Sequence, residues 1–314
     1  MKRLHQQGKV ILGSNALLTI CSDKTASQVA QLYAQLWKKI AEFDQHFSRF
    51  RHDSEVTLLN EHAGETIVIS GEFRDLLLTA KKMAKITSGV FNPFILPALQ
   101  RAGYKKSWAP NAATANPPDY SDREVVAYNN LEVSDLTARI PANSAIDLGG
   151  IGKGYLLDVL SIILEEAGIR DYWLSLGGDI IASGADAAGQ PWSIGIANAL
   201  EPSKTIASVL IPKGKKLAIT TSGITRRKGF YNDKPWHHLI DATKGIPAET
   251  DIVTATVCTT SGIIADIYAS CLVTLGTKKH KGFTTRHIIK DVLLQVGDEN
   301  STTMKLYGKR IALV

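Results

Sequence analysis

Apolar residues recur at two different spacings along the chain, and each spacing predicts a different kind of element. Residues 26–47 carry apolar side chains one helical turn apart, namely Val29, Leu32, Leu36, Ile40, Phe43 and Phe47. This spacing predicts one long amphipathic helix. Residues 71–89 repeat the pattern and end at Gly89, where a left-handed helix cap is expected. Residues 9–20, in contrast, predict a strand pair or a bent strand.

The rest of the chain mixes short apolar runs with helical patterns. The stretch 47–60 is polar and then predicts a brief helix, and another short helix has Pro93 near its start. Further helices are predicted from Ile151 and near 261–276 and 282–292, before a final strand or hairpin. Strands are predicted around 125–147 and at 171–183, 192–198, 205–211 and 217–221.

These elements favour an α+β fold with a mixed α/β sheet over a doubly wound fold. Residues 105–124 are rich in Pro, Ala, Asn and Asp, the composition of a flexible surface excursion. We therefore expect a single domain over 1–314 that carries an excursion near 105–124.

Composition and charge narrow the class of protein. The 314 residues are 44% hydrophobic and 21% charged, which is typical of a globular protein with a large core. The net charge is +6, but the basic residues are scattered, so an anionic small ligand suits the pattern as well as nucleic acid does. The three cysteines lack metal-type spacing, and we expect neither a disulfide framework nor a zinc site.

The location of the protein is predicted only from what the chain lacks. The first residues contain basic side chains but no uninterrupted apolar stretch and no small-residue cleavage site, so no signal peptide or lipoprotein anchor is expected. No segment reaches transmembrane length, and we expect no stable membrane insertion. A cytoplasmic location is the prediction; a leader removed beforehand would instead allow a periplasmic or membrane-anchored protein.

The segment AIDLGGIGKGY at 145–155 has the residues of an anion-binding turn. Asp147 is expected to end a strand, the glycines let backbone approach a ligand, and Lys153 falls in the first turn of the following helix. Free N–H groups at a helix N-terminus bind phosphate. The spacing fits neither a Walker A loop nor the dinucleotide fingerprint. The alternative is a tight turn whose lysine is simply solvated.

Asp266 and Ser270 interrupt an otherwise apolar helix at 263–276. Residues four apart project from one helix face, so a carboxylate and a hydroxyl are presented together. Magnesium prefers such oxygen ligands, with waters and phosphates completing its shell. The alternative is an aspartate in the first helical turn and a serine bonded back to its own helix.

Two more segments carry polar residues next to apolar strands. In the stretch 220–249, His238 is a candidate base or phosphate contact, with Asp241 to orient it. His237 there is expected to be a surface histidine of a hairpin. The segment LGGD at 176–179 predicts only a turn.

Taken in order, several segments resemble the ApbE family, the FAD:protein FMN transferases, over most of the chain. The matching stretches are FSRF and DSEVTLLN within 47–60, GVFNPFILPAL at 89–99, AIDLGGIGKGY at 145–155, LSLGGDI at 174–180, PWSIGI at 191–196, TTSG at 220–223, HHLID at 237–241 and ADIYAS at 265–270. The resemblance implies one α/β unit with FAD in a cleft and Mg²⁺ bridging its phosphates to the protein. It also implies cleavage of the FAD pyrophosphate, release of AMP, and attachment of FMN to a Thr or Ser hydroxyl of a target flavoprotein.

The resemblance also assigns roles to individual residues of this chain. It implies that Gly150, through its backbone carbonyl, binds the metal together with Asp266 and Ser270. It implies contacts to FAD from Leu12, Phe50, Gly103, Tyr104, Asp147, Lys153 and His238. The implied catalytic residues are Lys153, on the developing phosphate charge, Asp266, and His238, which would accept the proton of the target hydroxyl. Such groups suffice for in-line displacement at phosphorus.

Several departures from the family pattern keep other functions open. The usual D-P-x-T-G is DATKG at 241–245, a tryptophan is lost before Gly103, and Phe50 replaces a tyrosine. A metal-dependent FAD pyrophosphatase, which would yield FMN and AMP, would use the same residues, and a non-enzymatic FAD-binding protein is the second alternative. Basic residues interleaved with aromatics are lacking, so nucleic acid is not expected as a partner. Self-flavinylation is not expected either, because CTTSGII at 258–264 lacks the acceptor motif.

Overall fold

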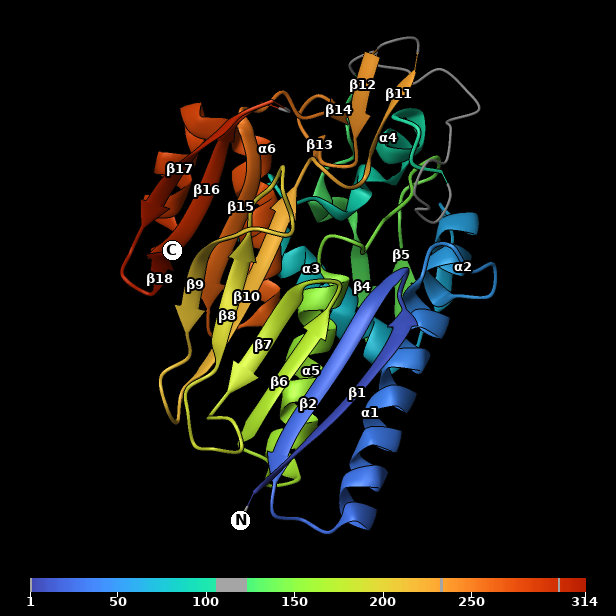
Figure 1. The fold of residues 1–314 in the computed structure, drawn as a ribbon. Helices are drawn as coiled ribbons and strands as arrows, with labels where there is room; N and C mark the ends of the chain where they lie inside the picture. The colour runs from blue at the N-terminus through green and yellow to red at the C-terminus, as the bar shows by residue number, and fades with distance from the viewer. Residues whose placement is uncertain (1, 106–122, 232–233, 299) are drawn as a thin grey trace.

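The computed structural model describes residues 2–105, 123–231, 234–298 and 300–314 (Figure 1). Its centre is an eight-stranded sheet in the order β1-β2-β6-β7-β10-β15-β16-β17. The strands are β1 (Arg3–Ile11), β2 (Ser14–Ser22), β6 (Asp171–Leu176), β7 (Asp179–Ser183), β10 (Lys216–Gly223), β15 (Ile252–Thr259), β16 (Asp291–Gly297) and β17 (Thr302–Tyr307). The α+β class predicted from the sequence is confirmed.

The pairing within this sheet differs from the mixed arrangement predicted. Each neighbouring pair along it is antiparallel. Two of the pairs close through two-residue turns with positive φ: Leu12 and Gly13 join β1 to β2, and Gly177 and Gly178 join β6 to β7. Turns of this kind match the twist of antiparallel strands, which explains why hairpins replace parallel crossovers there.

Helices cover one face of the sheet. They are α1 (Ala26–Phe47), α3 (Gly71–Ile86), α5 (Gly152–Glu166) and α6 (Gly262–Arg286), and in Figure 1 α1, α3, α5 and α6 lie behind the strands. Leu18 and Ile20 of β2 are fully buried in the same cluster as Leu36 and Ile40 of α1. Because strand side chains alternate between faces, the neighbouring Cys21 belongs instead to the cluster on the opposite face.

A three-stranded sheet covers part of that opposite face. It consists of β8 (Ser193–Ala197), β9 (Thr205–Leu210) and β18 (Ile311–Leu313), in the order β18-β9-β8. Its Ile194 and Val209 pack with Leu217 and Ile219 of β10. The central strands are therefore buried on both faces, which accounts for the continuous burial along β15.

The remaining elements lie at one end of the molecule and beside the helices. They are α2 (Glu55–Glu61), β3 (Thr66–Val68), η1 (Pro93–Ile95), α4 (Leu96–Arg101), η2 (Tyr128–Asn130), β4 (Glu132–Ser134), β5 (Thr137–Arg139), β11 (Lys228–Tyr231), β12 (Lys234–His237), β13 (Ile240–Asp241) and β14 (Ile246–Pro247). The hairpin of β11 and β12 stands above α4 at the top of Figure 1. A small apolar cluster joins Leu99 and Tyr104, at the end of α4, to Trp236 and Ile240.

Strongly periodic segments follow the sequence prediction closely. The helix at 26–47 and the strand pair at the N-terminus are confirmed, and so is the left-handed Gly89, with φ of 81°, after α3. Thr25 and Gln28 form a capping box at the start of α1, which fixes that end. The predicted excursion falls mostly on residues outside the described part of the chain, and the single domain over 1–314 stays a prediction.

Three predicted elements are corrected. Between 125 and 147 the only strands are β4 and β5, and Asp147 lies in an irregular segment rather than at a strand end. The last helical region is one element, kinked at Gly276 (φ 64°), where the Asp251 carboxylate accepts a hydrogen bond from the backbone N–H of Thr277. The predicted helix at 282–292 ends at Arg286, and Asp291 begins β16. Among the described residues, no helix is long and apolar enough to cross a membrane.

Candidate functional site

Two sheet turns and the start of α5 meet at one end of the central sheet. A Cβ placed on Gly177 would lie 2.9 Å from Ser14 Oγ and 3.9 Å from Lys153 Cδ. The turn after β1, the turn after β6 and Lys153 are therefore in contact distance of one another. Leu12 takes a positive φ of 56° in the first of these turns, a conformation that costs energy in a leucine and often marks a functional position.

Lys153 is held by a carboxylate rather than solvated. Its Nζ forms an ion pair with Oδ2 of Asp179, the first residue of β7, whose side chain is 3% exposed. The other oxygen, Oδ1, accepts a hydrogen bond of 3.1 Å from the backbone N–H of Thr221. Desolvation, with Arg226 and Arg227 nearby, lowers the pKa of Lys153 despite the opposing charge of Asp266.

Asp266 of α6 faces the same helix start. Its Oδ2 accepts a hydrogen bond of 3.0 Å from the backbone N–H of Gly154. Burial raises the pKa of Asp266, while Lys153 and this hydrogen bond oppose the rise. The alternative considered from the sequence was an aspartate that serves the first turn of its own helix. Asp266 instead binds the backbone of α5.

The two helices approach closely enough to exclude side chains at their contact. A Cβ on Gly154 would lie 2.4 Å from the carbonyl oxygen of Gly262. On the other side of this contact, Asp158 of α5 accepts hydrogen bonds from the backbone N–H groups of Gly262 (2.7 Å) and Ile263 (3.1 Å) and from Ser261 Oγ (2.8 Å). Each helix thus supplies a carboxylate to first-turn N–H groups of the other helix. Negative charge is stabilising at a helix N-terminus, where these N–H groups lack partners within their own helix.

Asp147 is engaged inside the protein. Its Oδ1 accepts a hydrogen bond of 2.8 Å from the backbone N–H of Gly149, and its Oδ2 lies 2.6 Å from Arg49 Nε in an ion pair whose side chains are 6% and 9% exposed. FAD would therefore have to compete with Gly149 and Arg49 for the Asp147 carboxylate, if Asp147 makes the contact that the resemblance implies.

The aromatic residues of the predicted pocket are brought together. Tyr104 packs edge-on against Phe50 at 5.9 Å and against the ring of His238 at 6.3 Å between centroids. Gly103, before it, has a φ of 110° and ends α4 in the left-handed conformation typical of this position. Phe50 is 42% exposed, so one side of this group faces solvent.

His238 is a half-buried histidine with a strongly lowered pKa. Burial, followed by the charge of Arg227, lowers its pKa to about 3, and its Nδ1 is buried without a hydrogen-bond partner among the described residues. Asp241 does not orient it, contrary to the prediction. The carboxylate of Asp241 accepts hydrogen bonds from the N–H and the hydroxyl of Thr243, because it opens the turn between β13 and β14.

His237 also differs from its prediction. It lies in the predicted hairpin, at the end of β12, but it is half-buried rather than a surface residue, with Nε2 3.0 Å from the carbonyl oxygen of Ala248. Burial lowers its pKa. A local pattern of adjacent histidines could not show that the chain at 246–248 folds back over them.

Comparison with known proteins bears on what this site is. The model of the ApbE family matches residues 12–293, nearly the whole chain. The chain belongs to the ApbE family. Curated relatives named "FAD:protein FMN transferase" include one from Vibrio cholerae, 26% identical over 79% of this chain and 74% of its own length. Another, from Escherichia coli K12, is 24% identical over 89% of this chain and 81% of its own. The relatives of this ApbE chain are thus named as transferases.

Solved structures show the same fold. The ApbE protein of Thermotoga maritima matches with a TM-score of 0.84 at 21% identity, covering 97% of both chains. The flavin transferase ApbE of Vibrio cholerae matches with a TM-score of 0.79 at 22% identity and covers 98% of both. The ApbE-like fold predicted from the sequence is confirmed.

The metal-ligand set implied by the ApbE resemblance fits Mg²⁺ by its chemistry. Asp266 keeps a carboxylate oxygen outside its bond to Gly154. Ser270 Oγ donates to the carbonyl of Ile267, as the alternative from the sequence expected, and it retains lone pairs for a cation. Groups of three or more His, Cys, Asp or Glu side chains that could hold an ion are absent from the described residues. One carboxylate, one hydroxyl and a carbonyl suit an ion that keeps waters and takes phosphate oxygens.

Four residues of the site escaped sequence analysis in these roles: Arg49, Asp158, Asp179 and Arg227. Asp179 was noted only as part of a turn. The charge of Arg227 affects the pKa values of four site residues, Tyr104, Lys153, His238 and Asp266. Arg227 therefore lies near the proposed phosphate-binding residues and near the aromatic group. Their charged side chains inside or beside the ApbE motifs could have marked them as site residues. Their roles could not be predicted, because their partners are remote in sequence.

Two surface hollows lie elsewhere. One, of about 240 Å³, is lined by Arg74, Asp75 and Val133 among others. The second, of about 290 Å³, is lined by residues of α1 with Lys24 and Ala167. Neither includes a residue assigned to FAD or to the metal, so these hollows add nothing to the ApbE site.

Proposed function

We propose that this protein is a Mg²⁺-dependent FAD:protein FMN transferase. It would split the FAD pyrophosphate, release AMP, and join FMN through a phosphoester to a Thr or Ser hydroxyl of an acceptor flavoprotein. Membership of the ApbE family supports flavin transfer in general. The observation that carries the finer proposal is the convergence of Lys153 and Asp266 at the start of α5, where Asp266 accepts a hydrogen bond from the Gly154 N–H and interacts with the charge of Lys153.

The proposed metal ligands are Asp266, Ser270 and the carbonyl of Gly150. When bound, Mg²⁺ would supply charge neutralisation and orientation of the phosphate oxygens. Lys153, already directed by Asp179, would hold the phosphates through its ammonium. Leu12, Phe50, Gly103 and Tyr104 would bound the nucleotide at the neighbouring turns, where Phe50 is exposed enough to meet a ligand.

His238 is the proposed acceptor of the hydroxyl proton. It is neutral at physiological pH because its pKa lies near 3, so one ring nitrogen is free to accept a proton. A base with so low a pKa is weak. Burial is the main cause of this low pKa, and the charge of Arg227 is the second. An anionic substrate beside Arg227 would offset the second cause, so the histidine would become a stronger base in the complex.

One observation favours hydrolysis of FAD as the second candidate. Asp241 is bound to Thr243 and leaves His238 without an orienting carboxylate among the described residues. A poorly oriented base would select less strictly between a protein hydroxyl and water. FAD pyrophosphatase activity, with FMN and AMP as products, would use the same phosphate and metal residues.

The test is the intact mass of a small acceptor domain bearing the family's target threonine motif, after incubation with this protein, FAD and Mg²⁺. A gain equal to FMN that disappears with a chelator is expected. FMN and AMP in solution without that gain would favour the pyrophosphatase, and intact FAD would contradict both activities.

The predicted cytoplasmic location remains a proposal, tested by fractionation of cells that express the native gene.

A further inference from the structure

The guanidinium of Arg49 connects three separate chain segments beside the proposed FAD site. Its Nε lies 2.6 Å from Asp147 Oδ2, and its Nη2 donates a hydrogen bond of 3.0 Å to the carbonyl of Tyr104. The loop after α1, the end of α4 and the turn before α5 are therefore joined by one side chain. The planar fork of arginine suits such simultaneous bonding, which the point charge of lysine cannot reproduce.

Two aromatic rings enclose the same guanidinium. Its Cζ lies 4.1 Å from the centroid of Phe50 and 4.8 Å from that of Tyr104. Both are cation–π contacts, which strengthen when the cation is desolvated, and the Arg49 side chain is only 6% exposed. The positions of these rings therefore depend on Arg49.

The ion pair also controls the charge beside the phosphate site. Asp147 is buried, and the segment after it leads directly to Gly150 and Lys153. Removing one partner of a buried pair leaves an uncompensated charge, which is strongly unfavourable. An unpaired Asp147 carboxylate would in addition repel the diphosphate of FAD.

We propose that Arg49 is a positioning residue for FAD: it neutralises Asp147 and fixes Phe50 and Tyr104 in the geometry that receives the dinucleotide. The inference rests on the proposed function in taking FAD as the ligand. It goes beyond that function in assigning the Arg49–Asp147 pair to affinity for an anionic flavin rather than to the transfer step.

The experiment is a double-mutant cycle on FAD affinity, measured by quenching of flavin fluorescence without an acceptor protein. Arg49→Met should raise the Kd for FAD by about tenfold or more, as expected when one member of a buried charge pair is removed. Arg49→Lys, which keeps the charge but loses the fork, should fall between this variant and the wild type. Asp147→Asn added to Arg49→Met should recover a large part of the lost affinity, because the uncompensated charge is then gone.

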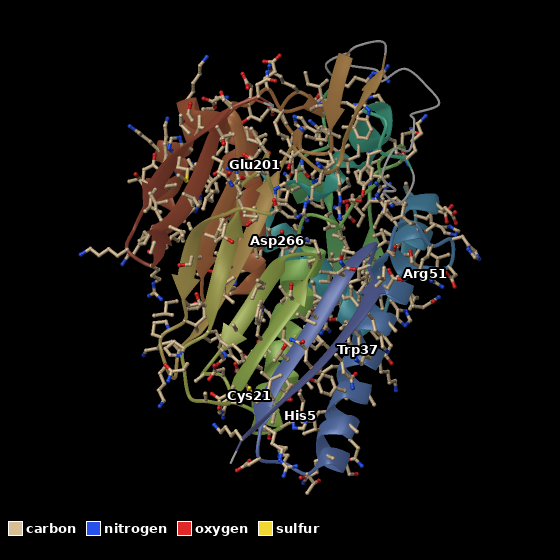
Figure 2. The ribbon with its side chains drawn as sticks, in the orientation of Figure 1. His5, Cys21, Trp37, Arg51, Glu201 and Asp266 are labelled. Atoms are coloured by element: carbon tan, nitrogen blue, oxygen red, sulfur yellow. The ribbon has the colours of Figure 1, made fainter. Side chains whose placement is uncertain are left out.

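Arg51→Met is the matched control. Arg51 lies two residues further on, is 40% exposed, and pairs with Asp44 and Asp53 at 4.0 and 3.5 Å. Figure 2 shows it at the edge of the molecule near α2, far from the central Asp266. The Arg51→Met variant should bind FAD with the affinity of the wild type. Circular dichroism at the assay temperature should establish that every variant is folded.

Two results would overturn the proposal. One is an Arg49→Met variant with wild-type affinity for FAD. The other is a folded double variant whose loss of FAD affinity equals the product of the losses measured for Arg49→Met alone and for Asp147→Asn alone, which would show that the residues act independently. A wild-type protein that binds FAD but transfers nothing would contradict the proposed function alone, so the two failures are distinguishable. If turnover occurs, the Arg49 variants should change KM for FAD in the same order as Kd, with a smaller change in kcat.

Discussion

Asp266 on α6 accepts a hydrogen bond of 3.0 Å from the backbone N–H of Gly154 on α5. This bond joins the proposed metal ligand to the helix turn that carries Lys153. It forms because both helices begin at the same contact, where glycines at 154 and 262 let the backbones meet. The site is therefore a property of the packing of α5 on α6 as much as of its charged side chains.

Gly154→Ala should destabilise the protein strongly. The new Cβ would lie 2.4 Å from the carbonyl oxygen of Gly262 and 2.8 Å from Asp266 Cβ, and backbone cannot move aside as a flexible side chain can. Overpacking of this kind costs typically 1–3 kcal/mol, and we expect about 3 kcal/mol in urea unfolding. Gly71→Ala is the control, because a Cβ there meets nothing within 4 Å. Equal stability of the two variants would contradict the close helix contact.

Asp158→Ala should loosen the same helix pair from the other side. The carboxylate accepts hydrogen bonds from Ser261, Gly262 and Ile263 at the start of α6. Loss of a helix cap costs about 0.5–2 kcal/mol; the loss here should lie near the top of that range. The measurement is urea unfolding, and Asp75→Ala, which removes an exposed surface ion pair, should have little effect. Unchanged stability of Asp158→Ala would show that the cap contributes nothing.

The stability of the protein should fall as pH drops below the ordinary pKa of histidine, partly because of His238. Its pKa is 6.5 when unperturbed and about 3 in the folded protein. Between these values the unfolded state binds a proton that the native state does not, so acid favours unfolding, by at most about 1.4 kcal/mol per pH unit. His238→Gln should reduce this slope relative to the wild type.

Free energies of unfolding measured at several pH values between 4 and 7 give the comparison. Identical slopes for wild type and His238→Gln would contradict the lowered pKa of His238.

Sequence reasoning predicted local features well and remote partners poorly. The helix at 26–47 was found because its apolar spacing, its cap and its length agree. The segment at 282–292 was assigned to a helix because short apolar runs fit both helix and strand; pairing with β15 makes 291–297 a strand. Only the tertiary fold decides such a run.

The site shows the same division. Lys153 and Asp266 were identified from their motifs, and the structure places them together. The partners Asp179, Asp158 and Arg49 lie 26, 103 to 105 and 98 residues from the groups they hold. No local spacing reports a contact over such distances. Asp241 was assigned to His238 on proximity in sequence, and a nearer turn partner, Thr243, takes its hydrogen bonds instead.

Asp266 is proposed to form part of the site at which FMN is transferred with the help of Mg²⁺. This proposal is tested most directly by the intact mass of an acceptor domain after incubation with FAD and Mg²⁺ and either the wild type or Asp266→Ala, with each enzyme shown to be folded. We predict an FMN-sized gain with the wild type, lost on chelation, and none with Asp266→Ala. A full gain with folded Asp266→Ala would contradict the assignment of this carboxylate.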